Sequence, residues 1–85
     1  MELTEQFQQA VADSKNLREK PANNILLKMY ALYKQSTTGD VNIDAPVNPI
    51  DFVAKAKYSA WEELKGRSAE SAMKDYVDLV TNLKG

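Results

Sequence analysis

Apolar residues in the first part of the chain recur at intervals of three and four, the spacing of one face of an α-helix. This pattern predicts a helix from Leu3 to Leu17. Pro21 disfavours helical backbone at the residue before it, so the helix should end by Lys20. The predicted apolar face consists of Leu3, Phe7, Ala10, Val11 and Leu17.

A second periodic segment carries more apolar surface than one helical face needs. Asn23 or Asn24 can cap its first turn by accepting a backbone N–H, and the helix should run to Ser36 or Thr37. One face can pack on a core, which leaves the other for a ligand or a partner. The first face consists of Ala22, Ile25, Leu26, Met29 and Leu32, and the second of Leu27, Tyr30, Tyr33 and Lys34.

The next stretch, residues 38–51, has no sustained period and reads as a long connection. A connection of this length allows the helices on either side of it to run parallel. Periodicity resumes from Phe52 to Lys65, where Gly66 suits a left-handed helix end. Ser68 can then cap a fourth helix, whose apolar face reaches Leu83.

Four amphipathic segments without a strand pattern predict an all-α fold, a four-helix bundle in which residues 1–85 form a single domain. The chain has neither cysteine nor histidine. This composition excludes a Ser-His or Cys-His nucleophilic pair and the usual kinds of zinc site. We therefore expect no catalytic residues, no metal and no enzyme activity.

The net charge of -1 gives no overall field that would attract a polyanion. Nucleic acid is therefore not an expected partner, and an anionic ligand must be small and bound by a few local cations. The sequence shows no signal-like start and no run of about 20 apolar residues. We expect a cytoplasmic protein without stable membrane insertion.

Candidate binding residues lie on the second and third helices. Tyr30, Tyr33, Lys34 and Gln35 offer hydroxyls, an ammonium and an amide within about one and a half turns, a set suited to a nucleotide. Lys57 lies on the apolar stripe of the third helix, a face that should otherwise be buried. The stripe consists of Val53, Ala56, Ala60, Trp61 and Leu64. From spacing alone, core tyrosines and lysines that reach water are the commoner explanation, and a phosphate site is the alternative.

Three motifs resemble the acyl-CoA-binding protein family. Residues 30–40, YALYKQSTTGD, are similar to the family pattern YxxYKQATxGD. Residues 55–66, KAKYSAWEELKG, are similar to KAKWxAWxxLKG, and residues 68–76, SAESAMKDY, to SxExAMxxY. With Phe7 and the junction at residues 20–22, the resemblance covers essentially the whole chain. Among the departures, Tyr58 replaces a tryptophan, and the loop at residues 47–49 is slightly longer.

The resemblance implies an up-down-down-up bundle with a long connection between its second and third helices. It implies binding of medium- to long-chain fatty acyl-CoA esters by a non-catalytic intracellular carrier and pool former, which needs no cofactor. It places Tyr30, Lys34 and Lys57 on the phosphates of coenzyme A and Lys15 near the adenine. The other implied ligand-binding residues are Val11, Leu26, Leu27, Tyr33 and Tyr76.

The predicted protein is a monomer that delivers acyl-CoA to enzymes that use it. Two other classes stay open from the residues alone. The second apolar face of the second helix also suits a protein-interaction module that docks a partner helix. A thioesterase is a more distant alternative, which would release free coenzyme A.

Overall fold

The computed structural model describes residues 2–84, so Met1 and Gly85 of the predicted domain lie outside the described part. Within it the chain forms four helices and no strand, which confirms the predicted all-α fold. None of the described helices is both long and apolar enough to span a membrane. The helices are α1 (Leu3–Ser14), α2 (Asn23–Thr37), α3 (Phe52–Glu62) and α4 (Ala69–Lys84).

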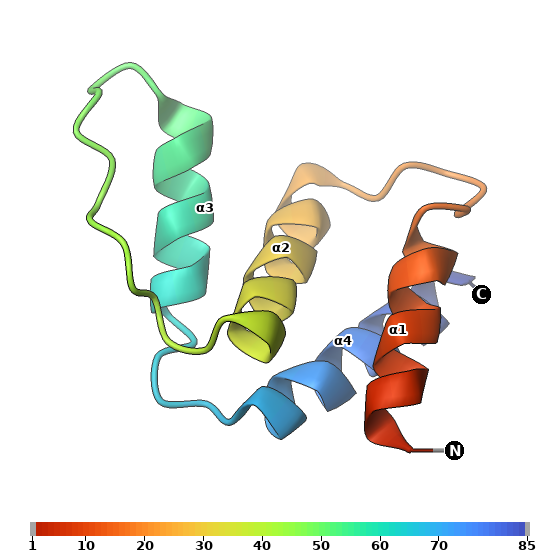
Figure 1. The fold of residues 1–85 in the computed structure, drawn as a ribbon. Helices are drawn as coiled ribbons and strands as arrows, with labels where there is room; N and C mark the ends of the chain where they lie inside the picture. Colours follow the sequence, from red (N-terminus) through yellow and green to blue (C-terminus); the bar gives the residue numbers. More distant parts are fainter. Residues whose placement is uncertain (1, 85) are drawn as a thin grey trace.

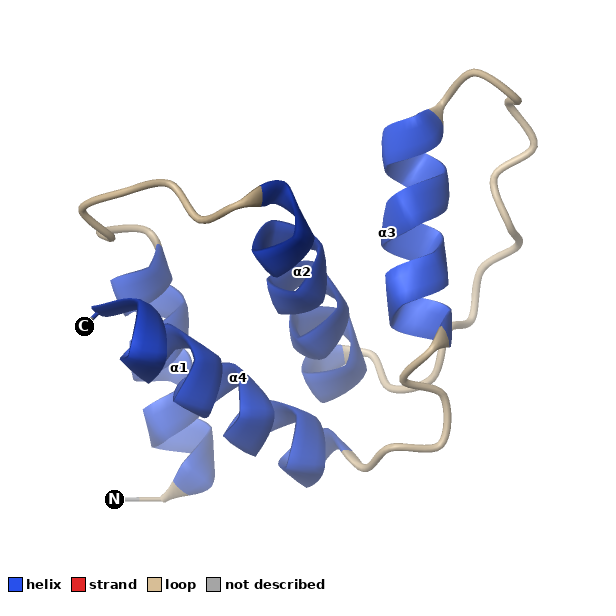
Figure 2. Cartoon of the chain, turned by 180° about the vertical axis from the view of Figure 1, so that it is seen from behind, coloured by secondary structure: helices blue, strands red, loops and turns tan. Residues whose placement is uncertain are grey.

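The arrangement of the helices follows from the lengths of their connections. α1 and α2 run in opposite directions, whereas the long connection of residues 38–51 returns the chain so that α3 runs parallel to α2 (Figure 1). α4 packs against both α1 and α2, while α3 packs against α2 alone. Figure 2 shows the same separation from behind, with α3 standing apart from α1 and α4.

One apolar core joins α1, α2 and α4. Each of these helices contributes apolar side chains at helical spacing, and their burial is the main favourable term in the stability of the bundle. Most of the core positions that the periodicity predicts on these helices are buried or packed against buried ones. The buried cluster consists of Phe7, Ala10, Met29, Leu32, Ala72, Tyr76 and Val80.

Two predicted features of the first two helices are wrong. α1 ends at Ser14, so Leu17 lies beyond the helix. Side chains near this end bond to backbone carbonyls, Ser14 Oγ to Val11 at 2.6 Å and Asn16 Nδ2 to Ala12 at 3.3 Å, and such bonds compete with helix continuation. α2 begins with Ala22 as its N-cap, and no side chain caps it.

The third helix is shorter and more exposed than its periodicity predicts. It ends at Glu62 and not at Lys65, although Gly66 has the expected left-handed backbone, with φ of 92°. Trp61 is its only fully buried residue, because α2 is the only helix that covers it. The prediction that Val53 belongs to a buried stripe is therefore wrong.

Side chains cap the third and fourth helices. The Asp51 carboxylate accepts the backbone N–H of Ala54 at 3.0 Å, a cap that was not predicted although an aspartate directly before the first helical residue is its usual signal. The Ser68 hydroxyl accepts the N–H of Ser71 at 3.1 Å, which confirms the predicted cap of α4. Both caps fix the positions at which the chain enters the helices.

Candidate functional site

Two lysines lie over aromatic rings where α2 faces α3. The Lys34 ammonium is 5.0 Å from the centroid of the Trp61 ring, and the Lys57 ammonium is 5.3 Å from the centroid of the Tyr30 ring. Each cation thus lies on a ring of the opposite helix, within the range of a cation–π attraction. We call Lys34 and Lys57 the lysine pair. The predicted phosphate ligands Tyr30, Lys34 and Lys57 are therefore brought together by the fold.

The ring beneath Lys34 is held rigidly. Trp61 is 1% exposed, and its indole Nε1 donates a hydrogen bond of 2.8 Å to the carbonyl of Gly39. Gly39 has φ of 91°, a backbone conformation that glycine adopts readily. The turn after α2 therefore anchors the tryptophan of α3, and through its ring it limits where Lys34 can lie.

A second set of bonds fixes the same turn to the connection between α3 and α4. The Gln35 side-chain amide donates to Asp40 Oδ1 and to the carbonyl of Arg67, both at 2.8 Å. Asp40 Oδ1 also accepts the N–H of Gly66 at 2.8 Å. This N–H, together with the Gln35 amide, lowers the pKa of Asp40 below its ordinary value of 3.8.

Gln35 does not take the role that the sequence suggested for it. The expected donor to a nucleotide is 0% exposed, and both bonds of its amide nitrogen are made within the protein. Spacing along α2 predicts which residues are neighbours on the helix surface. It does not predict how deeply the rest of the fold buries each of them. Gln35 is a structural residue that positions the turn carrying Gly39 and Asp40.

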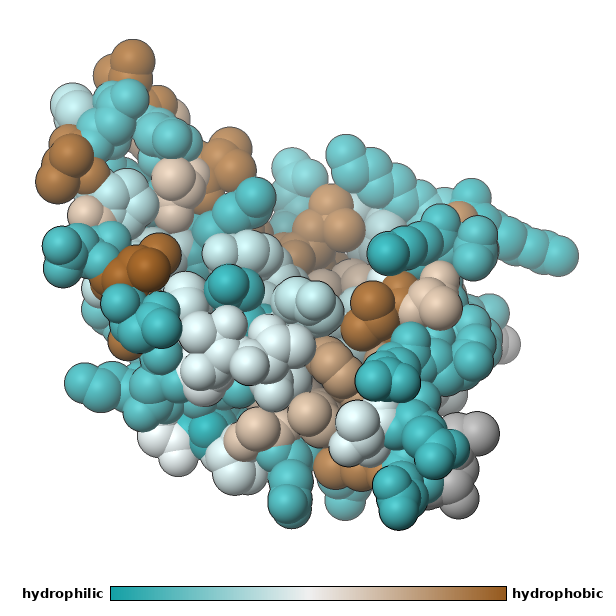
Figure 3. Space-filling model, viewed as in Figure 1, coloured by the Kyte–Doolittle hydropathy of each residue, from teal (hydrophilic) through white to brown (hydrophobic). Residues whose placement is uncertain are grey.

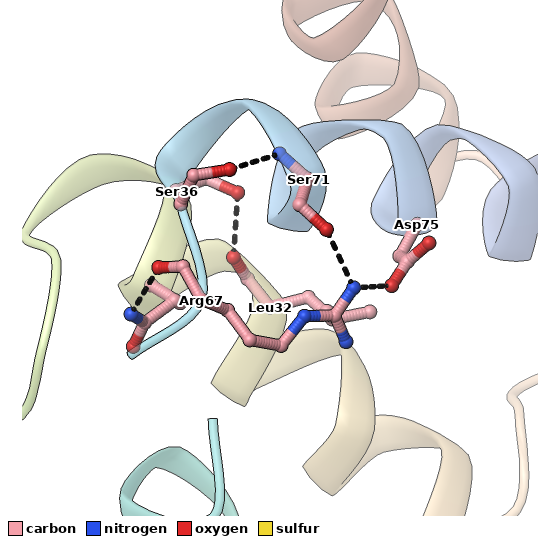
Figure 4. A network of polar contacts seen from close by, with 7 residues as sticks. Leu32, Ser36, Arg67, Ser71 and Asp75 are labelled. Carbon is pink, nitrogen blue, oxygen red and sulfur yellow. Dashed lines mark hydrogen bonds and ion pairs between the residues drawn. The ribbon is translucent and has the colours of Figure 1, made fainter. Parts of the chain in front are cut away.

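Arg67 completes the support of this region (Figure 4). Its guanidinium donates to the Ser71 hydroxyl at 2.9 Å and pairs with the Asp75 carboxylate, both on α4. Its backbone carbonyl accepts the Gln35 bond from α2. One residue of the connection between α3 and α4 is thereby bonded to α2 and to α4.

An apolar groove of about 380 Å³ runs between α2 and α3. The predicted ligand-binding residues Leu26, Leu27 and Lys57 line it. The other wall residues were not predicted to belong to the site, although Val53 and Ala56 share a helix face with Lys57, which is a usable signal. The wall is completed by Asn23, Phe52, Val53 and Ala56.

A second hollow, of about 410 Å³, contains two further predicted residues, Val11 and Tyr33. α1 and α2 make no close backbone contact, and the hollow is lined by residues of both helices together with Met73 of α4. The Tyr33 ring stacks on Phe7, with centroids 5.9 Å apart and planes at 26°. The walls of this second hollow therefore offer flat rings, a methionine and hydroxyl groups.

Two predicted residues lie apart from the lysine pair. Tyr76 is 4% exposed, and its hydroxyl donates to Ser14 Oγ at 3.2 Å, while its ring packs edge-on against Phe7 with centroids 5.2 Å apart. Lys15 is exposed at the C-cap of α1, and within the described residues its ammonium forms no ion pair or hydrogen bond. The fold alone therefore does not bring these two side chains to the lysine pair.

A further hollow of about 440 Å³ lies beyond the C-terminal end of α1. Its lining is largely exposed and charged or polar, and includes Asn16, Arg18, Glu19 and Lys84. It lacks the apolar wall and the aromatic rings that surround the lysine pair. We therefore assign the candidate site to the groove between α2 and α3.

The geometry defines a class of protein. Within residues 2–84, no group of three or more acidic side chains could hold a metal ion. The site combines cations held over rings, the hydroxyl of Tyr30 and an apolar groove, features suited to a small molecule with an anionic group and an apolar group. The chain is in structural terms a helical ligand-binding module.

Comparisons with known proteins agree with this class. The family described as "Acyl CoA binding protein" matches residues 4–80. "Acyl-CoA-binding protein homolog 1" of Caenorhabditis elegans is 47% identical over 81 residues, which are 95% of this chain and 93% of that protein. The acyl-CoA-binding protein of Dictyostelium discoideum is 47% identical over 77 residues, 91% of this chain and 90% of that one.

Solved structures show the same fold. Acyl-CoA-binding protein 2 of Oryza sativa superposes with a TM-score of 0.89 at 34% identity and covers 95% of this chain and 87% of its own. A protein of Moniliophthora perniciosa, titled ACBP, gives 0.88 at 36% identity, covering 98% of this chain and 80% of its own. The chain belongs to the acyl-CoA-binding protein family, which is a family of non-catalytic binding proteins.

Proposed function

We propose that residues 1–85 form one acyl-CoA-binding domain that binds medium- to long-chain fatty acyl-CoA esters and serves as their intracellular carrier. The observation that carries this proposal is the position of the lysine pair. Lys57 lies over the ring of Tyr30 and at the same time lines the apolar groove between α2 and α3. A phosphate bound by the lysine pair is thus adjacent to a surface suited to an acyl chain.

The two ends of the ligand have separate places in the proposal. Tyr30, Lys34 and Lys57 bind phosphate oxygens, and the acyl chain lies along Leu26 and Leu27 in the groove. Charge-assisted hydrogen bonds contribute about 1.5–3 kcal/mol each, and each buried methylene contributes about 0.8 kcal/mol. The phosphates therefore define the class of ligand, and the length of the chain sets the affinity.

The nucleotide occupies the side of the molecule that carries the second hollow. Tyr33 and Val11 line this hollow and offer an exposed ring and an apolar wall for the adenine. Lys15, at the C-cap of α1 and four residues after Val11, binds the same part of the ligand. Tyr76 supports the hollow from α4 through its contact with Phe7, which is one of the wall residues.

The carrier acts as a cytoplasmic monomer in this proposal, without cofactor or metal. Burying the acyl chain in the groove keeps it from water and from other apolar surfaces. The bound ester is then delivered to enzymes that use acyl-CoA. The protein itself has no part in bond making or breaking.

Single lysine substitutions test the proposal. In Lys34→Ala and Lys57→Ala, we expect binding of palmitoyl-CoA to weaken by about ten- to a hundredfold in calorimetric titration, since each loses one charge-assisted phosphate contact. Lys28→Ala is the matched control, because Lys28 is an exposed lysine of the same helix that lies outside the groove. A hydrophobic docking groove for a partner helix would be insensitive to all three substitutions, and that result would contradict the proposal.

A further inference from the structure

The exposed apolar side chains of this protein gather in one segment. Apart from Tyr33, every large apolar side chain that is exposed among the described residues belongs to residues 43–53. Four of them fall within seven residues: Val47 is 94% exposed, Ile50 77%, Phe52 76% and Val53 64%. We call residues 47–53 the apolar tip. Figure 3 shows hydrophobic residues along the outer edge and the end of this part of the molecule, at the upper left.

The apolar tip continues the wall of the ligand groove. Phe52 and Val53 belong to the tip and also line the groove between α2 and α3. A surface that covers the tip therefore meets the end of the groove at which these two residues lie. An acyl chain that leaves the groove past Phe52 and Val53 would pass directly into that surface.

The tip carries almost no charge with which to recognise a charged partner. Its only ionisable side chain is Asp51, whose carboxylate accepts the N–H of Ala54 and so caps α3. The one cation bonded to the tip is the Lys55 ammonium, which donates to the Pro49 carbonyl at 3.4 Å, so one charge of each sign lies there. Binding through the tip must therefore come from apolar burial, which depends little on salt. A specific protein interface usually needs about 20–30 residues on each side, whereas binding at a bilayer surface scales with the apolar area inserted, so a small apolar patch suits weak, reversible binding there.

We infer that the apolar tip docks this protein on lipid bilayers, including those with zwitterionic headgroups, so that acyl-CoA passes between the bilayer and the groove. The inference rests on the proposed carrier function and adds the surface through which the carrier is loaded and unloaded. Residues 39–51 form no helix or strand, so their backbone groups need water and the insertion is shallow. The contact is peripheral and reversible.

Flotation of the ligand-free protein with phosphatidylcholine vesicles tests the inference. The wild-type protein should float with the vesicles equally at about 0.1 M and about 1 M salt, between which the Debye length falls from about 10 to about 3 Å. Val47→Asp with Ile50→Asp should reduce the bound fraction on the order of tenfold or more, because both side chains lose apolar burial. Neither residue lines the ligand groove.

The control variant makes the same change in charge near the C-terminal end of α4. Thr81→Asp with Asn82→Asp adds the same two charges at exposed positions and should float like the wild type. Titration of the tip variant with palmitoyl-CoA in the absence of vesicles should give the wild-type affinity. If the wild-type protein does not bind palmitoyl-CoA in the same titration, the carrier function itself is refuted, whether or not the tip binds vesicles.

Three outcomes would overturn the inference. The first is a wild-type protein that floats no better than the tip variant. The second is flotation that requires anionic lipid or disappears at high salt, since a charged surface would then account for it. The third is self-association of the wild type that the tip substitutions abolish without vesicles present, which would make the tip an interface between two copies of the chain.

Discussion

At the scale of single residues, each lysine of the pair lies over a ring of the other helix. An ammonium over an aromatic face gains about 0.5–1 kcal/mol at an exposed site, which is less than a phosphate contact contributes. The rings therefore hold Lys34 and Lys57 near the groove without competing with an anion. Trp61 can do this because its hydrogen bond to Gly39 prevents it from moving.

Tyr76 gives a prediction that separates support of the fold from contact with the ligand. Tyr76→Phe removes the bond to Ser14, so the free energy of unfolding should fall by about 0.5–1.5 kcal/mol in urea denaturation. Binding of palmitoyl-CoA should weaken by less than tenfold, because the hydroxyl is neutral. Ser14→Ala removes the acceptor of this bond and also the bond of Ser14 to the Val11 carbonyl, so it should lose at least as much stability. A loss of affinity as large as that of Lys34→Ala would instead make Tyr76 a principal ligand contact.

Asp40 gives a prediction about pH. The pKa of Asp40 is lowered in the folded protein by the N–H of Gly66 and by the Gln35 amide, so its carboxylate stabilises the fold above pH 3.8, and this stabilisation is lost as the pH falls through the lowered value. Asp40→Ala should therefore have a lower melting temperature than the wild type at pH 7.

The difference between Asp40→Ala and the wild type should narrow below about pH 4, as the carboxyl becomes protonated. Asp78→Ala, at an exposed position on α4, is the control and should show little difference at either pH. If the melting temperature of Asp40→Ala stays below that of the wild type by the same amount down to pH 2, this account is contradicted.

At the scale of the elements, the sequence predicted which segments are helices and left several of their ends wrong. Periodicity indicates the face on which a helix packs, and it was enough to predict the core residues of α2 and α4. It could not show that Ser14 and Asn16 would bond to carbonyls at the end of α1. It also could not show that α3 would be covered by α2 alone, which is why Val53 lies at the surface.

The site was predictable to the extent that it lies on two helix faces. The motifs placed Tyr30, Lys34 and Lys57 in one site, and α2 and α3 bring these residues together. The burial of Gln35 could not be predicted, because it depends on a contact distant in sequence, in which the Arg67 carbonyl of the connection between α3 and α4 accepts the Gln35 amide. Phe52 was missed as a wall residue, since an apolar residue at a helix start ordinarily reads as part of the core.

The weak attachment of α3 leads to a prediction for hydrogen exchange. α3 has a single fully buried residue and packs against one helix, so its backbone amides should exchange faster than those of α2 and α4. A ligand that fills the groove between α2 and α3 should slow exchange in α3 more than in α4. Mass spectrometry of the free and the palmitoyl-CoA-bound protein measures both. Equal protection of α3 and α4 in the free protein would contradict this view.

At the scale of the whole molecule, the bundle divides into a core of three helices and one helix that forms a groove. The core of α1, α2 and α4 gives stability, while α3 leaves apolar surface of α2 uncovered and available to a ligand. The bonds of Gln35, Asp40 and Arg67 hold the two parts in register. A small chain can thereby keep an open binding surface without losing its core.

This division predicts how affinity changes with the length of the acyl chain. Each methylene that enters the groove should strengthen binding about fourfold, from about 0.8 kcal/mol of apolar burial. The gain should end once the chain extends beyond Phe52 and Val53, at the end of the groove. Titration with a series of saturated acyl-CoA esters measures the slope and the plateau. An affinity independent of chain length would show that the groove does not hold the chain.

The most direct test of the central claim is a titration of one protein sample with three ligands. Palmitoyl-CoA, free coenzyme A and free palmitate are added in separate calorimetric experiments under the same conditions. We predict one-to-one binding of the ester that is much tighter than that of either half, because only the ester occupies the lysine pair and the groove together. Equal binding of palmitate and its ester, or binding of none of the three, would contradict the assignment of this site to acyl-CoA.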